Sequence, residues 1–142
     1  MKKNVLFICT NNSARSQMAE GLMNTLYGEK YVAYSAGIEP TKVNPYAIKA
    51  MAEIGIDISG HRSKSIQEFR TKHFDYVVTV CDNAKESCPF FPGDNVLHKG
   101  FQDPSKFKGT DDEVLKKVRQ VRDEIKDWIH ETFGKEISAN LS

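Results

Sequence analysis

Residues 5–20 read VLFICTNNSARSQMAE, and their first five positions form an unbroken apolar run that ends at Cys9. A short apolar run of this kind, followed by the turn-forming residues 10–13, predicts a strand that is buried on both faces. From Arg15 onward, apolar residues recur every three or four positions, which is the period of a helix. The stretch therefore predicts a buried strand, a short loop and a helix in direct succession.

The same alternation of strand and helix patterns continues through the rest of the chain. Further strands are expected at residues 31–36, 76–80 and 96–98, and further helices at residues 45–54, 65–70 and from 110 onward. Thr110 and Glu113 form a capping box at the start of the last helix. Its buried stripe is expected to consist of Val114, Val118, Val121, Ile125 and either Trp128 or Ile129. This order predicts a small doubly wound α/β domain, with a parallel sheet and helices on both faces.

Length and composition limit the class of protein. A chain of 142 residues has room for about one domain, which we expect at residues 1–133, followed by a flexible tail at residues 134–142. The 20 basic and 19 acidic residues leave a net charge of +1, which argues against a polybasic nucleic-acid-binding protein and against a disordered chain. The apolar run after Lys3 is too short for a signal peptide or a membrane span, so we expect a cytoplasmic monomer.

The residues most capable of chemical reaction are the three cysteines, Cys9, Cys81 and Cys88. An odd number in a cytoplasmic protein argues against a structural disulfide framework. The cysteines lack Cys-x2-Cys spacing and no histidine lies near them in sequence, so no metal site is expected. Cys9 and Cys81 both follow predicted strands, and the carboxyl ends of parallel strands share the sheet edge where ligands bind. A free cysteine is most often a small buried apolar residue, so a chemical role depends on its neighbours.

The loop after the first strand has the residues to bind a tetrahedral oxyanion. The loop can curl at the positive end of the following helix so that its backbone N–H groups point inward. These groups belong to Thr10, Asn11, Asn12, Ser13 and Ala14. Arg15 supplies a planar fork for two oxygens, and Ser16 a hydroxyl donor for the sulfur of Cys9. Such surroundings favour a nucleophilic thiolate. Cys-x5-Arg arises by chance in about one such chain in ten, but requiring the serine lowers this to roughly one in 140.

The quoted stretch resembles the phosphate-binding loop of the low-molecular-weight protein tyrosine phosphatase superfamily. Residues 34–37 (YSAG) and 55–59 (GIDIS) are similar to the same superfamily, and the resemblance covers residues 3–133. It implies a four-stranded parallel sheet with the catalytic loop after the first strand. It also implies a late Asp-Pro pair that protonates the leaving oxygen, and Asp103 with Pro104 matches. An Asp-Pro pair taken alone is more often a turn.

The region of the other two cysteines distinguishes two branches of the superfamily. Residues 80–89 (VCDNAKESCP) resemble the additional cysteines of thioredoxin-coupled arsenate reductases, in which they form a relay. The resemblance implies that Cys9 attacks arsenate, that Cys81 attacks Cys9, and that Cys88 then forms a Cys81–Cys88 disulfide. Thioredoxin would reduce this disulfide, without metal or organic cofactor, and phosphate or sulfate is expected to compete with arsenate for the loop. The tyrosine that follows Asp-Pro in many phosphatases is replaced by Ser105.

Two other functions stay open at this point. A protein or small-molecule phosphatase would use Cys9, Arg15 and Asp103 and would not need Cys81 or Cys88. A non-catalytic oxyanion-binding or redox-sensing module would show no turnover.

Three positions depart from the superfamily's usual pattern. Asn11 stands where glycine is usual, which matters only if the residue needs a positive φ. Ala14 stands where relatives often have cysteine.

Some arsenate reductases of the family hold a potassium ion through residues that match Asn12, Glu20 and Ser35, but Lys64 stands at the position of the fourth ligand, an aspartate. We expect the ammonium of Lys64 to take the place of the ion, pairing with Glu20 and orienting Asn12.

Overall fold

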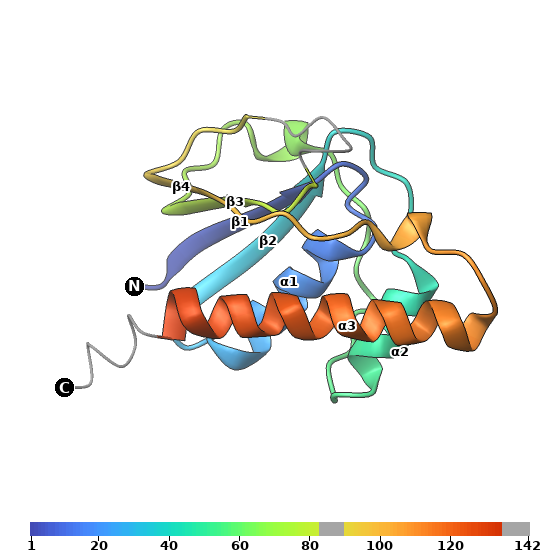
Figure 1. Cartoon of the computed structure of the whole chain (residues 1–142). Coiled ribbons are helices and arrows are strands. Elements are labelled where there is room, and N and C mark those ends of the chain that lie inside the picture. Colours follow the sequence, from blue (N-terminus) through green and yellow to red (C-terminus); the bar gives the residue numbers. More distant parts are fainter. Residues whose placement is uncertain (83–89, 135–142) are drawn as a thin grey trace.

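The computed structural model describes residues 1–82 and 90–134 (Figure 1). Its strands are β1 (Lys3–Cys9), β2 (Tyr31–Gly37), β3 (Tyr76–Thr79) and β4 (Asn95–His98), and its α-helices are α1 (Arg15–Leu26), α2 (Pro45–Ala52) and α3 (Asp111–Ile129). Two 3₁₀ helices, η1 (Ile66–Phe69) and η2 (Pro104–Lys106), and the π-helical turn η3 (His130–Gly134) complete the order. The expected strands and helices are all present, whereas η2 and η3 were not predicted. Cys88 and the tail beyond residue 134 lie outside the described residues.

The four strands form one parallel sheet in the order β2-β1-β3-β4, which confirms the predicted fold class. The run from Val5 to Ile8 is completely buried, as its lack of polar positions predicts, because β1 lies between β2 and β3. The register pairs Cys9 with Gly37 on β2 and Ile8 with Thr79 on β3. Cys9 and the segment that follows β3 therefore meet at one edge of the sheet.

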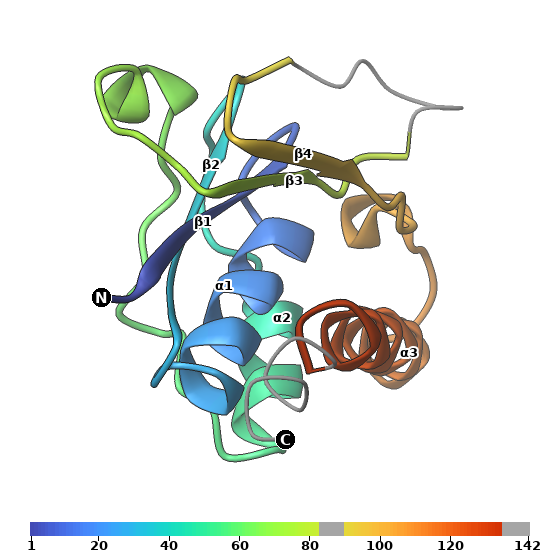
Figure 2. The same cartoon turned by 90° about the vertical axis from the view of Figure 1, so that its left-hand side faces the viewer.

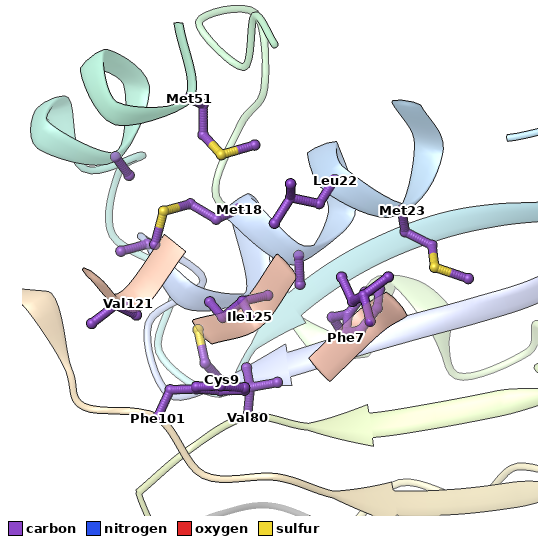
Figure 3. Close-up of a cluster of buried hydrophobic side chains, with 14 of the residues drawn as sticks. Phe7, Cys9, Met18, Leu22, Met23, Met51, Val80, Phe101, Val121 and Ile125 are labelled. Atoms are coloured by element: carbon purple, nitrogen blue, oxygen red, sulfur yellow. The ribbon is translucent and has the colours of Figure 1, made fainter. Parts of the chain in front are cut away.

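Helices cover both faces of the sheet, but unequally. All three α-helices pack on one face, over a core that includes Phe7 and Val78 (Figure 2). The opposite face is covered by η1 and its neighbouring loops, over a smaller cluster that includes Leu6, Phe74 and Phe91. Side chains of β1, α1 and α3 meet in the main core close to Cys9 (Figure 3).

Helix α3 follows its sequence pattern closely. Both hydrogen bonds of the capping box between Thr110 and Glu113 are present. The expected stripe is buried, and it ends on Ile129, while Trp128 is only partly buried. Across the residues that the structure describes, no helix combines the length and apolarity needed to cross a membrane.

Candidate active site

The loop between β1 and α1 turns its carbonyl groups outward. The carbonyl oxygen of Thr10 accepts a hydrogen bond from the backbone of Glu39 at 2.9 Å, and that of Ser13 accepts one from Asn44 at 2.9 Å. The carbonyl oxygen of Asn11 accepts a hydrogen bond from the Ser63 hydroxyl at 2.8 Å. Because these carbonyls face away from the loop centre, the intervening N–H groups face into it, which is the arrangement of an anion-binding nest. α1 begins at Arg15 without a side-chain cap, which leaves its positive end open to an anion.

Gly37 at the end of β2 supports this loop by close backbone packing. A Cβ atom at Gly37 would lie 2.7 Å from both the amide nitrogen of Asn12 and the carbonyl oxygen of Thr10. Backbone atoms cannot move aside as a flexible side chain can, so any substitution here displaces the loop.

We therefore expect Gly37→Ala to lower the free energy of unfolding by about 1–3 kcal/mol and to weaken binding of inorganic phosphate. Gly60→Ala is the matched control, because a Cβ atom at Gly60 meets nothing within 4 Å. Urea unfolding and phosphate titration of both variants measure the two effects. A Gly37→Ala protein as stable and as tightly phosphate-binding as Gly60→Ala would contradict this role.

The nucleophile candidate and the arginine are both buried at the base of the loop. The Sγ atom of Cys9 lies 2.9 Å from the hydroxyl of Ser16, as expected from their positions. Arg15 is 2 % exposed and donates from Nη1 to the carbonyl oxygen of Phe101 at 3.2 Å. Figure 3 places Cys9 beside Phe101 and Val80. A guanidinium held at this depth is available to an anion in the loop without first being ordered.

Asp103 joins the loop from the other end of the chain. Its Oδ1 accepts a hydrogen bond from the backbone of Ser105 at 2.9 Å, which caps η2, and its Oδ2 lies 3.6 Å from Nη2 of Arg15. The Asp-Pro pair thus forms a turn and also places a carboxyl group at the loop. The turn is therefore confirmed, and the role of Asp103 as a general acid stays a prediction that its position permits.

A cavity of about 440 Å³ opens beside the loop. Its lining includes Thr10 and Asn11 from the loop, Asp103, and Asp82 from the segment that follows β3. One aromatic side chain, Phe107, also lines it. The cavity therefore connects the oxyanion loop with the candidate acid and with the residue next to Cys81.

Cys81 lies in the same buried cluster as Cys9. The Sγ atom of Cys81 lies 3.8 Å from the carbonyl oxygen of Ile8, the residue before Cys9. The predicted meeting of these two cysteines at one sheet edge is confirmed. The contact expected between Cys81 and Cys88 falls outside the part of the chain that the structure describes.

The two asparagines of the loop have different roles. Asn12 adopts a positive φ of 49°, whereas Asn11 does not. Asn11 instead donates from Nδ2 to the carbonyl oxygen of Glu39 at 2.9 Å. The substitution of glycine by Asn11 is therefore tolerated because a left-handed conformation is not needed there.

Lys64 lies where the sequence comparison placed a cation ligand. Its Nζ is 3.8 Å from Oε1 of Glu20, which also accepts a hydrogen bond from the Ser35 hydroxyl at 2.8 Å. Its side chain is only 13 % exposed, and burial lowers the pKa of the ammonium, with Glu20 opposing that shift. Asn12 is oriented by the backbone N–H of Lys64, at 2.8 Å from Oδ1, rather than by the ammonium as expected. These residues do not fit a potassium ion, because the site already contains a positive charge.

Within residues 1–82 and 90–134, one group of side chains has the spacing of metal ligands. Candidate ligand atoms of His73, Asp75 and Asp94 lie within 4.8 Å of one another. They lie at the amino end of β3, on the sheet edge opposite to Cys9, where Asp75 accepts from the backbone of Asn4. The group takes no part in the oxyanion site.

The contacts that hold the loop from outside were not predicted from the sequence. Gln17, Ser63 and the carbonyl group of Phe101 each hydrogen-bond to the loop or to Arg15. Ser63 and Phe101 are far from the loop in the chain, and Gln17 looks like any polar residue of a helix's first turn. The only sequence signal was that Gln17 directly follows Ser16.

Comparisons with known proteins extend these observations. The chain is 50% identical over 125 residues to an arsenate reductase of Halalkalibacterium halodurans, covering 87% of this chain and 90% of that protein. A solved structure described as an arsenate reductase in the phosphate binding state superposes with a TM-score of 0.79 at 34% identity, covering 95% of this chain and 98% of that one. A thioredoxin-dependent arsenate reductase of Corynebacterium glutamicum superposes with a TM-score of 0.63 at 26% identity, covering 91% of this chain and 62% of that one.

The family description agrees with the loop geometry. The sequence profile of the family described as low molecular weight phosphotyrosine protein phosphatase matches residues 4–141. This range contains the oxyanion loop, the arginine, Asp103 and Cys81. The chain belongs to the low-molecular-weight phosphotyrosine protein phosphatase family.

Proposed function

We propose that the chain reduces arsenate to arsenite by a relay through three cysteines that thioredoxin regenerates, as an enzyme of arsenic detoxification. The observation that carries the proposal is the position of Cys81, a buried cysteine in the same cluster as Cys9. A phosphatase has no use for a second thiol at this place, since water completes its reaction. The names of the relatives, arsenate reductases with one thioredoxin-dependent neighbour, support the same choice.

The first step is attack of the Cys9 thiolate on arsenic. Ser16 donates to the sulfur, and the loop N–H groups and Arg15 hold the arsenate oxygens as charge develops on them. A sulfur–arsenic bond forms while a hydroxide departs, and Asp103, 3.6 Å from Arg15, protonates it to water. Phosphate and sulfate have the same tetrahedral shape and compete for the loop.

The next steps transfer electrons. The thiolate of Cys81 attacks Sγ of Cys9, so that a disulfide forms, the sulfur–arsenic bond breaks, and its electron pair stays on arsenic, which leaves as arsenite. Cys88 then attacks Cys81, which returns the Cys9 thiolate and leaves a Cys81–Cys88 disulfide. A thioredoxin dithiol reduces this disulfide. No resident metal or organic cofactor is needed in this scheme.

The test compares two activities of one preparation. Arsenate-dependent oxidation of NADPH, with thioredoxin and thioredoxin reductase present, measures the proposed reaction, and hydrolysis of an aryl phosphate measures the phosphatase alternative. We expect steady arsenate turnover. Brisk ester hydrolysis without arsenate turnover would instead favour the phosphatase, to which the cavity lined by Phe107 is suited.

The buried ammonium of Lys64 predicts that potassium does not activate this chain. We expect equal activity in sodium and potassium salts at equal ionic strength, because the ammonium already compensates Glu20. Lys64→Asp should introduce a dependence on potassium, while Lys49→Asp, on α2 away from the loop, should not. Marked potassium activation of the unmodified protein would contradict this expectation.

A further inference from the structure

The side chain of Gln17 is completely buried and its orientation is unambiguous. Its Nε2 lies 3.1 Å from the carbonyl oxygen of Asn12 and 2.9 Å from that of Arg62. Backbone carbonyls only accept hydrogen bonds, so the nitrogen must face them and Oε1 must face the other way. Oε1 lies 3.0 Å from Nδ1 of His61, so this histidine nitrogen carries a proton. Glu20 Oε2, 3.3 Å from the same Nδ1, requires the same proton.

Gln17 and the backbone N–H of Lys64 together determine the orientation of Asn12. Oδ1 of Asn12 receives two hydrogen bonds, from Nε2 of Gln17 at 2.9 Å and from the backbone N–H of Lys64 at 2.8 Å. Nδ2 of Asn12 is therefore the atom that faces the Ser16 hydroxyl, at 2.8 Å, and it can only donate.

The chain of donors ends on the nucleophile. Because the Ser16 oxygen accepts from Asn12, its own proton is free to point at Sγ of Cys9, 2.9 Å away. This hydrogen bond stabilises a thiolate more than a neutral thiol, because a charged sulfur is the stronger acceptor. The direction of every bond from Gln17 to Cys9 thus favours the ionised sulfur.

We propose that Gln17 is a positioning residue that fixes this direction together with the Lys64 N–H and thereby raises the thiolate population of Cys9. It touches neither the sulfur nor the oxyanion cavity, and it acts only through Asn12 and Ser16. A glutamate at this position would present a carboxylate to three oxygens. Turning over the Asn12 amide relieves one of these three contacts, at the cost of the hydrogen bond from the Lys64 N–H. The Ser16 proton is then drawn toward Asn12 and away from Cys9.

The proposal rests on Cys9 as the nucleophile of the proposed function, but titrating Cys9 requires no turnover. Absence of arsenate reduction and absence of a Gln17 effect are therefore separate results. The ionisable groups around Cys9 are Arg15 on α1, Asp103 before η2 and Cys81 after β3. At the other end of the hydrogen-bonded chain, the ionisable groups near Gln17 are His61, Glu20 and Lys64. None of them is changed in the test.

The test measures the rate of alkylation of Cys9 by iodoacetamide against pH, read from the Cys9 peptide by mass spectrometry. In Gln17→Glu, we expect the pH midpoint of thiolate formation to rise by roughly one unit, the worth of one hydrogen bond to a charged group. Gln120→Glu, the same change at an exposed position of α3, should keep the parental midpoint. At neutral pH, kcat should fall in Gln17→Glu and recover as the pH is raised.

Gln17→Met removes the amide without adding charge, and it carries the test if Gln17→Glu does not fold. We expect a smaller upward shift of the midpoint in Gln17→Met, with stabilisation by inorganic phosphate retained. A parental midpoint in a Gln17 variant that folds would overturn the proposal. Loss of phosphate binding with a parental midpoint would also overturn it, since it would show only structural support of the loop.

Discussion

Replacing Cys9 by serine is expected to abolish arsenate reduction and phosphate-ester hydrolysis together, each by roughly 10⁴-fold or more. The loop is suited to an anion on sulfur, and a serine hydroxyl does not ionise there.

Arg15→Lys should also cause a large loss of activity, for a different reason. A lysine cannot both reach the carbonyl oxygen of Phe101 and present two parallel donors to the oxyanion, so we expect a loss of about 10²–10³-fold.

Steady-state assays of both reactions measure these losses, and phosphate titration shows whether the loop remains formed. Cys9→Ser should still bind phosphate, because its backbone N–H groups are unchanged. Arg119→Lys is the matched control for the arginine, since Arg119 forms an exposed pair with Glu53 on the far side of the helices. Retained turnover in Cys9→Ser would show that another group is the nucleophile.

The relay predicts a second large effect, which differs between its last two cysteines. Cys88→Ser should release one arsenite per protein molecule and then stop at a Cys9–Cys81 disulfide. Cys81→Ser should release none, because Cys81 is the thiol that, among residues 1–82 and 90–134, shares the Cys9 cluster and can displace arsenic. Both variants should keep whatever ester hydrolysis the unmodified protein shows, since neither cysteine acts in that reaction.

Quenched single-turnover reactions with arsenite quantification separate these cases. Steady multiple turnover by Cys88→Ser, with thioredoxin as the only reductant, would contradict the role given to Cys88. Equal arsenite yields from the two variants would contradict the order in which the two cysteines act.

Contacts between residues close in sequence were predictable because their geometry follows from the local element. Cys9 and Ser16 meet because a short loop links a strand to the first turn of a helix. The capping box of α3 has a fixed spacing and needs no tertiary information. The fully buried β1 was recognisable because a strand covered on both faces has no polar positions.

Contacts between distant segments were not predictable in the same way. Residues 61–64 reach the loop through Gln17 and Asn12, across separations of more than forty residues, and no local pattern marks them. The residue with a left-handed conformation is Asn12, and not Asn11, which replaces the usual glycine. The conformation of the loop depends on its distant hydrogen-bond partners, which the sequence does not reveal. Placement of all three α-helices on one face depends on packing that single-segment patterns do not encode.

One measurement tests the three-cysteine relay most directly: disulfide mapping of the unmodified protein after a single turnover with arsenate and no reductant. The relay predicts one arsenite per protein molecule, a protein lighter by two hydrogen atoms, and a peptide that links Cys81 to Cys88 while Cys9 stays free. Arsenite released from a protein whose three thiols all remain reduced, or a final disulfide that includes Cys9 while Cys88 is free, would contradict it.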